Sequence, residues 1–344
     1  MNIDCTYTVS VPDGWSAEAL HDALCNANRI VLIAHKNADG DAVGSLTGMY
    51  ALLRLNTDAE VTPLLPDGCP EDLTWLPNTQ YIIDCGRDKQ KALEAVNKAE
   101  LIIALDLNNV ERTGNMAEAI SQTKALKVMI DHHIDPQREM FDIVVSDDTI
   151  SSACEMVYWT MRKVFGKKAF NKDAATSLYC GICTDTGTFS YSNTRESIYL
   201  ASAELLSFGI DPMAINHNIK NVFTTHRLKF FGFAFNERLT VYKDEKVALM
   251  VLSYNDINSR GVVSSDLTGL VNEVMKLRDI DCAVLIREES ESVRLSFRSK
   301  ELFNVNLIAK ELFDGGGHEH AAGATSYLTL TETVAKVKRY FSVE

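Results

Sequence analysis

The stretch Arg29–Ser45, RIVLIAHKNADGDAVGS, decides the fold of the first half of the chain. It opens with an apolar run, Ile30–Ala34, whose length and β-branched content predict a buried parallel strand. His35 follows at once, and Asp39 and Asp41 come just before small residues that predict the start of a helix. Side chains at the carboxyl end of a parallel strand lie where open α/β sheets bind ligands.

One imidazole and two carboxylates at such a place are typical ligands of divalent metal ions. Gly40 separates the two aspartates. We expect its conformational freedom to let the two carboxylates diverge toward different ions.

Two further apolar segments also run directly into acidic or histidine residues. Leu101–Leu105 ends at Asp106, and Leu126–Ile130 ends at the triplet Asp131–His133. A single aspartate after a strand is often only a turn residue or a helix cap. Three such strands favour a shared site, because parallel strands deliver their carboxyl ends to one edge of the sheet.

Asp185 is a fourth candidate for the same edge of the sheet. It lies in a polar segment, 184–188, after the helix that the apolar spacing predicts over 172–183. Further helices are expected over 16–28, 87–98, 151–165, 195–208, 211–219, 265–277 and 303–313, and strands over 61–65, 239–242, 247–252, 282–287 and 292–298.

The length of 344 residues suggests two domains. We expect an α/β domain over 1–220 with a mostly parallel sheet and flanking helices. A helical linker is expected over 221–238, followed by a smaller domain with a mixed sheet over 239–344.

The composition is that of an ordinary globular protein, with 46% hydrophobic and 24% charged residues. The sequence has no apolar run of membrane-spanning length and no signal-peptide pattern, so we expect a cytoplasmic protein without a membrane partner. The eight cysteines are scattered and are expected to be free thiols, mostly buried. Cys180 and Cys183 have the spacing of a redox motif, but no second pair completes a zinc site.

The formal net charge of −13 argues against a protein that binds long duplex nucleic acid through a basic surface. A small anionic substrate remains compatible with this charge, because bound divalent cations invert the local sign of an acidic site.

Six candidate metal ligands share the imidazole and carboxylate chemistry described above: His35, Asp39, Asp41, Asp106, His132 and Asp185. This donor set, without thiolate, suits manganese, magnesium or iron, and the histidines favour manganese over magnesium. Four carboxylates in one pocket repel one another unless cations neutralise them, which argues for two divalent cations. Two metals about 3.5–4 Å apart clamp the attacking and leaving oxygens of an in-line displacement at phosphorus.

In order and spacing, these residues resemble the four motifs of the DHH phosphoesterase superfamily. The segment 315–323, GGGHEHAAG, resembles the signature of the DHH-associated substrate domain. The resemblance covers nearly the whole chain. It points to the nano-RNase type, whose members degrade short oligonucleotides and also act as phosphatases on 3′-phosphoadenosine 5′-phosphate. Ala38 stands where the family usually has proline, which removes loop stiffness but no ligand.

The resemblance implies that Asp106 bridges the two ions. The other ligands would divide between the ions into two groups: His35 and Asp39 for one, and Asp41, His132 and Asp185 for the other. Asp131 would orient a histidine, as metal-binding imidazoles usually require. His133 would face the phosphoryl group of the substrate or its leaving group.

The resemblance also implies a phosphate-binding site in the second domain. His318, on a glycine-rich loop with Gly316 and Gly317, would bind a substrate phosphate. Arg298 is a second candidate contact, because its planar fork suits phosphate oxygens, and Arg112 is a third. For both arginines the alternative is an ordinary surface ion pair.

The expected function is a manganese-dependent phosphoesterase that hydrolyses short oligonucleotides, from dinucleotides to about five-mers, and converts 3′-phosphoadenosine 5′-phosphate to AMP. One alternative is a phosphodiesterase for linear or cyclic dinucleotides such as pApA, pGpG or cyclic di-AMP. Another is a non-catalytic nucleotide-binding module, which the six filled ligand positions disfavour. A homodimer is suggested by analogy alone.

Overall fold

The computed structural model describes residues 15–343 except for Ser192, residues 221–223 and Thr268. The chain divides into two compact units, Met1–Val222 and Phe223–Glu344. The first cysteine, Cys5, and the first three residues of the expected linker lie outside the described residues. Within the described part, no helix combines the length and the apolar character needed to cross a membrane.

The first unit contains a six-stranded, entirely parallel sheet with the order β3-β2-β1-β4-β5-β6. Its strands are β1 Arg29–Ile33, β2 Glu60–Leu65, β3 Ile83–Asp84, β4 Leu101–Leu105, β5 Leu126–Asp131 and β6 Ile143–Ser146. β1, β4 and β5, which precede the candidate ligands, are neighbours in the sheet. The parallel sheet and the shared edge are therefore as expected.

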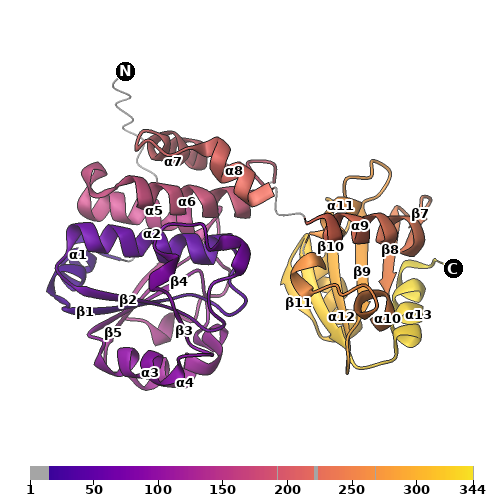
Figure 1. Ribbon diagram of the computed structural model, residues 1–344, viewed down its shortest axis with the longest axis horizontal. Helices are drawn as coiled ribbons and strands as arrows, with labels where there is room; N and C mark the ends of the chain where they lie inside the picture. Colours follow the sequence, from indigo (N-terminus) through magenta and orange to yellow (C-terminus); the bar gives the residue numbers. More distant parts are fainter. Residues whose placement is uncertain (1–14, 192, 221–223, 268, 344) are drawn as a thin grey trace. The chain divides into compact units, whose positions relative to one another are not determined.

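Helices cover both faces of this sheet (Figure 1). One face carries α1 Ala17–Asn26, α2 Gly40–Asn56, α5 Ala153–Phe165 and α6 Lys172–Asp185, and the other carries α3 Lys89–Lys98 and α4 Ala117–Gln122. Alternate residues of β1 enter opposite cores: Ile30 and Leu32 lie on the α2 side, and Val31 and Ile33 on the α3 side. This burial on both faces explains the uninterrupted apolar run.

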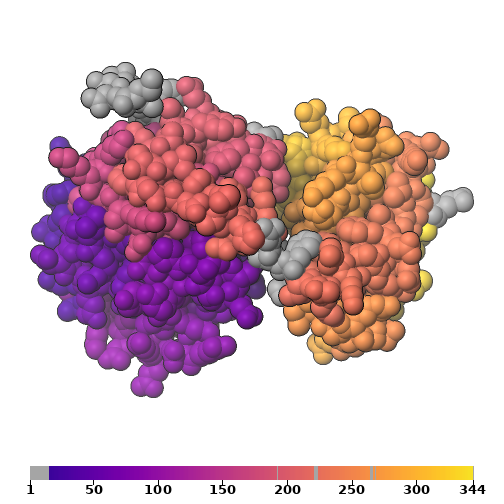
Figure 2. Space-filling view, turned by 45° about the horizontal axis from the view of Figure 1, so that its top comes forward, coloured from indigo at the N-terminus to yellow at the C-terminus, as the bar shows by residue number. Residues whose placement is uncertain are grey.

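Two more helices, α7 Glu196–Leu206 and α8 Pro212–Lys220, form an outer layer of the first unit. Figure 1 shows this layer beside α5 and α6, and in Figure 2 it forms part of the visible surface of the first unit. The short 3₁₀-helices of the chain are η1 Glu71–Leu73, η2 Thr79–Tyr81, η3 Val110–Met116, η4 Arg138–Met140, η5 Lys167–Ala169 and η7 Ser264–Leu267.

Close packing of α2 against α6 corrects the expected role of Gly40. Gly40 is the first residue of α2 and does not have a positive φ. A Cβ atom at this position would lie 2.4 Å from Cγ2 of Thr184 on α6. Glycine is therefore required for the close approach of two helices and not for an unusual backbone conformation.

The second unit contains a mixed six-stranded sheet with the order β11-β12-β10-β9-β8-β7. Its strands are β7 Leu239–Tyr242, β8 Val247–Leu252, β9 Cys282–Glu288, β10 Val293–Ser299, β11 Gly316–His318 and β12 Ala321–Ser326. β8 and β9 pair in parallel, and the other neighbours pair antiparallel.

Helices also pack on both faces of the second sheet. α12 Val305–Phe313 and α13 Leu330–Phe341 cover one face, and α9 Thr225–Phe233 and α11 Leu270–Val274 pack on the other. The π-helix η6 Ala234–Arg238 continues α9, and α10 Tyr254–Asn258 follows β8. The segment α9, expected in a linker, packs into the core of the second unit.

Three local expectations are wrong. The helix expected over 265–277 is the short α11, preceded by a 3₁₀ turn. In place of a glycine-rich loop over 315–318, Gly316–His318 forms strand β11. Asp185 does not lie in a polar segment after α6 but is the last residue of that helix.

Candidate metal centre

The candidate ligands lie at the carboxyl edge of the first sheet. His35 comes two residues after β1, Asp106 directly follows β4, and His132 and His133 follow β5. Asp106 has a left-handed backbone, with φ 56°. Aspartate is among the few residues that tolerate this conformation, and here it turns the chain sharply at the end of the strand.

The first turn of α2 positions the next two carboxylates. Asp39 caps this helix, and its Oδ1 accepts hydrogen bonds from the backbone N–H groups of Asp41 and Ala42 at 3.0 and 3.1 Å. Its side chain therefore stabilises the helix start as well as facing the cluster. Asp41, two residues on, is buried, with 1% of its surface exposed.

Asp106 lies at the centre of the cluster. Its Oδ2 is 3.3 Å from Nε2 of His35, and its Oδ1 is 3.5 Å from Nε2 of His132. Oδ1 is buried and has no hydrogen-bond partner among the described residues. A buried carboxylate oxygen without such a partner is costly unless a cation compensates it.

His132 joins the remaining two carboxylates to this centre. Its Nε2 is 3.7 Å from Oδ2 of Asp41 and 3.5 Å from Oδ2 of Asp185. The structure thus brings together all six residues expected as ligands, in overlapping groups whose donor atoms lie within 4.8 Å of one another: His35, Asp39 and Asp106; Asp41, His132 and Asp185; Asp106, His132 and His133.

The orientation of His35 also fits metal binding. Its Nδ1–H donates to the backbone carbonyl of Lys36 at 2.8 Å, which leaves Nε2 facing Asp106. A second hydrogen bond of this kind fixes the ring and the tautomer of most metal-binding histidines. The donor set, the burial and the orphaned oxygen of Asp106 together fit divalent cations.

The ionisation of these groups is strongly coupled. Burial alone would lower the pKa of His132, but contact with Asp106 and its neighbours raises it to about 10. Burial, with repulsion from Asp106, raises the pKa of Asp41 to about 7, and burial likewise raises the pKa of Asp185. Burial would also raise the pKa of Asp106, but contacts with His132 and His35 hold it well below its usual range. The cluster therefore retains protons that a metal ion would displace.

His133 is held by partners on both sides of its ring. Its Nδ1 is 2.8 Å from Oδ1 of Asp131, and Nη1 of Arg112 is 3.1 Å from its Nε2. Because arginine can only donate, Nε2 must accept, so the proton is on Nδ1 and is donated to Asp131. The structure thus places Asp131 and Arg112 beside His133.

The second-unit candidates form a separate group. His318 on β11 pairs with Ala321 on β12, which in turn pairs with Arg298 on β10. Directly paired residues of antiparallel strands point to the same face, so His318 and Arg298 share one row, with Cα atoms about 10 Å apart. Gly316 and Gly317 precede His318 in β11, and a Cβ at Gly317 would lie 2.5 Å from the carbonyl oxygen of Ala321.

Two positions missed in the sequence contact the cluster from α5. The backbone N–H groups of Ala153 and Cys154 donate to the carboxylate of Asp41. The signal that marks this helix start is Ser152 followed by Glu155, the pattern of a helix cap. That pattern predicts where the helix begins but not which distant carboxylate its N-terminus meets.

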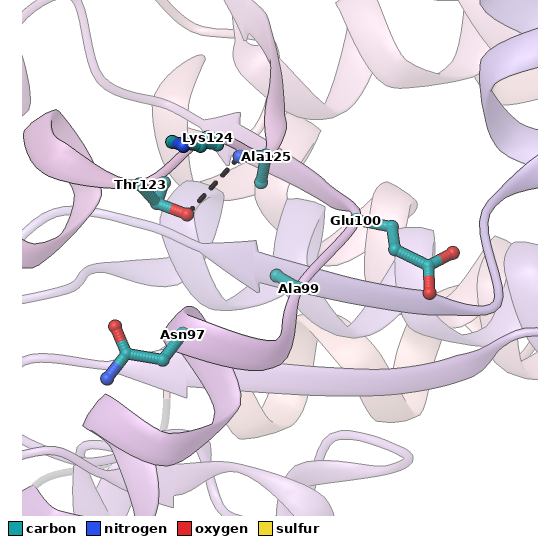
Figure 3. Close-up of a pocket in the computed structure, with 6 residues that line it drawn as sticks. All are labelled: Asn97, Ala99, Glu100, Thr123, Lys124 and Ala125. Atoms are coloured by element: carbon teal, nitrogen blue, oxygen red, sulfur yellow. Dashed lines mark hydrogen bonds between the residues drawn. The ribbon is translucent and has the colours of Figure 1, made fainter.

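A surface depression lies at the opposite, amino-terminal edge of the first sheet (Figure 3). Its lining comes from the end of α3 and from the residues that connect α3 to β4 and α4 to β5: Asn97, Ala99, Glu100, Thr123, Lys124 and Ala125. None of the candidate site residues lines it.

The seven described cysteines form no disulfide. Cys180 and Cys183 are buried in α6. Burial raises the pKa of both thiols, that of Cys183 to about 12, which disfavours a reactive thiolate.

Comparison with known proteins identifies relatives for both units. Residues 29–182 match the DHH family, N-terminal domain, and residues 244–342 match the DHHA1 domain. The bifunctional oligoribonuclease and PAP phosphatase NrnA of Bacillus subtilis (strain 168) is 29% identical over 303 residues, which cover 87% of this chain and 89% of that protein.

Solved structures show the same fold. An exopolyphosphatase-related protein from Bacteroides fragilis is 31% identical, with a TM-score of 0.91 over 95% of each chain. RecJ from Thermus thermophilus, in complex with Mn²⁺, has a TM-score of 0.54 at 12% identity, covering 95% of this chain and 54% of that one. The likeness to RecJ shows the fold alone.

Proposed function

Because the chain belongs to the DHH family and is therefore a phosphoesterase, we propose that its substrates are short oligonucleotides and 3′-phosphoadenosine 5′-phosphate. The products would be mononucleotides and AMP. The 29% identical B. subtilis protein, a bifunctional oligoribonuclease and PAP phosphatase, supports this choice of substrates.

The observation that carries the proposal is the convergence of six candidate metal ligands, with Asp106 at the centre of the other five. We propose that one divalent cation is held by His35, Asp39 and Asp106. The second is held by Asp41, Asp106, His132 and Asp185. When bound, two such cations supply Lewis acidity at phosphorus and a water-derived nucleophile at neutral pH. Manganese is the proposed ion, since it accepts imidazole and carboxylate ligands together.

The proposed role of His133 is to transfer a proton at Nε2. Asp131 holds the opposite nitrogen, so Nε2 is the ring atom that could exchange a proton with water or substrate. Arg112 donates to this atom in the structure. A substrate phosphate that recruits the Arg112 guanidinium would free Nε2 to take a proton from water. The imidazolium, stabilised by Asp131, would then donate that proton to the departing oxygen.

In the second unit we propose a binding site for substrate phosphate. His318 and Arg298 lie in one row of the sheet. The two residues before His318 in β11, Gly316 and Gly317, have no side chains. Arginine matches phosphate oxygens with two parallel N–H groups, and glycine lets an anion approach backbone N–H groups closely.

The test is a side-by-side kinetic comparison with purified full-length protein and Mn²⁺. The substrates are pApA, pGpG, an RNA five-mer, 3′-phosphoadenosine 5′-phosphate and cyclic di-AMP. We expect mononucleotides from the short oligomers and AMP from 3′-phosphoadenosine 5′-phosphate.

Two results would change this conclusion. Turnover of cyclic di-AMP without turnover of 3′-phosphoadenosine 5′-phosphate would favour a dedicated dinucleotide phosphodiesterase. Absence of any product from protein that has bound Mn²⁺ would favour a nucleotide-binding module.

A further inference from the structure

The N-terminus of α5 contacts a proposed metal ligand that belongs to another helix. The backbone N–H of Ala153 donates to Oδ2 of Asp41 at 2.6 Å, and the N–H of Cys154 donates to Oδ1 at 2.9 Å. One helix end therefore holds both oxygens of this carboxylate. Ser152 caps the helix through its own side chain, so the two N–H groups are left for Asp41.

Packing fixes this contact in place. The thiol of Cys154 donates to the backbone carbonyl of Asp41 at 3.5 Å. The same sulfur fills a notch between two glycines: a Cβ would lie 2.2 Å from it at Gly181 on α6, and 3.0 Å from it at Gly44 on α2. The helices α2, α5 and α6 therefore meet around the Asp41 contact without room for a second arrangement.

The same start of α5 is also tied to Asp185. Nδ2 of Asn193 donates to the backbone carbonyls of Ser151 and Asp185, both at 3.2 Å. The hydroxyl of Ser151 donates back to the carbonyl of Asn193. Ser151 is buried, with 1% of its surface exposed. A closed set of hydrogen bonds thus connects the segment 151–154 to the end of α6 that carries Asp185.

We propose that the segment Ser151–Cys154 positions the two carboxylates of one metal ion, the ion held by Asp41, His132 and Asp185. The other ion, held by His35 and Asp39, should depend on this segment less. The bonds that orient those two side chains are to the backbone of Lys36, Asp41 and Ala42, not to the start of α5. This inference rests on the proposed two-metal function. Partners that orient metal ligands typically change metal affinity 10–100-fold when they are lost.

The experiment replaces Ala153 with proline and measures Mn²⁺ binding by titration calorimetry. Ala153 is the first residue of α5, where proline is tolerated, and Ser152 already has the extended backbone that precedes a proline. The substitution removes one N–H and displaces Oδ2 of Asp41. The matched control is Ala17→Pro, which makes the same change after Ser16 at the first position of α1, far from the cluster in sequence.

We expect Ala153→Pro to lower the affinity for one of the two Mn²⁺ ions by about 10–100-fold and to leave the affinity for the other unchanged. Ala17→Pro should bind both ions with wild-type affinity. Wild-type affinity for both ions in Ala153→Pro would overturn the proposal, and so would equal weakening of both ions.

A second comparison is informative even when the Ala153→Pro variant does not fold. Asp41→Asn keeps an oxygen for one of the two backbone N–H donors but places an amide NH₂ against the other, so we expect its Tm in EDTA to fall. The carboxylate of Asp185 contacts His132 and, among the described contacts, no such pair of backbone donors, so Asp185→Asn should lower Tm in EDTA less. Equal shifts would contradict the proposal. Both readouts are independent of hydrolysis, so an inactive wild-type protein that binds two ions would refute the proposed function and not this inference.

Discussion

At the scale of single residues, Asp106 is the most constrained side chain of the centre. It ends β4 in a left-handed conformation, it is buried, and both of its oxygens face imidazoles. The sequence predicts its place after a strand, and with it the places of His35 and His132. The proton position on His133 could not be predicted, because it depends on Arg112, which is brought close by a turn in η3.

Asp106→Asn should abolish turnover with little effect on folding. Asparagine tolerates the left-handed backbone but lacks the charge that bridges two cations. We expect kcat to fall by about three orders of magnitude, measured on pApA with saturating Mn²⁺. Circular dichroism provides the control for folding. A variant that kept more than a tenth of the activity would contradict a bridging role.

Metal affinity should rise with pH. The pKa of Asp41 is raised to about 7 and that of His132 to about 10, so both retain protons near neutrality that Mn²⁺ must displace. Raising the pH from 6 to 8 deprotonates these groups progressively and should tighten binding. Calorimetry in buffers of different ionisation enthalpy should detect proton release on binding. Affinity independent of pH, without proton release, would refute this coupling.

At the scale of elements, apolar periodicity predicts β1, β4, β5, α5 and α6, because each buries a long and regular apolar face. The strands β11 and β12 escape prediction, since glycine and alanine have low strand propensity and pairing alone makes them strands. The position of Asp185 on the last turn of α6 could not be predicted either, because helix ends depend on local capping more than on periodicity.

Gly181→Ala should destabilise the protein by about 1–3 kcal/mol, because the new methyl group would overlap the sulfur of Cys154 and approach Oδ1 of Asp41. The matched control is Gly232→Ala, on α9, where a Cβ meets nothing within 4 Å. That change should stabilise the protein by up to about 1 kcal/mol. Urea unfolding measures both. Equal effects would show that the contact of α2, α5 and α6 is looser than described.

At the scale of the whole molecule, the two units have separate cores, and each carries its own group of candidate site residues. Length predicts two domains, but the change from long helices to short strands places the start of the second at residue 239, whereas the second unit begins at Phe223. Composition does not predict that α9 packs with the second unit, since the same helical pattern fits a linker equally well. The net charge of −13 also does not predict that His318 and Arg298 lie in one row of the second sheet.

Arg298→Ala should raise KM for 3′-phosphoadenosine 5′-phosphate by about tenfold with little change in kcat, because it removes substrate binding and not chemistry. Arg294→Ala is the matched control. It lies on the same strand and the same face, four residues away, and should leave KM unchanged. Similar effects of both variants would indicate general electrostatic attraction instead of a specific phosphate contact.

Asp39 is both the cap of α2 and a proposed metal ligand, and this has a consequence for a relative that loses activity. Its Oδ1 caps the N-terminus of α2, and asparagine caps helices equally well. A chain that drifted to asparagine at this position would keep its shape and its resistance to heat, and would lose only its hold on one ion. Such a descendant would pass every screen that scores solubility or folding, and would be recognised as inert only when given something to cleave.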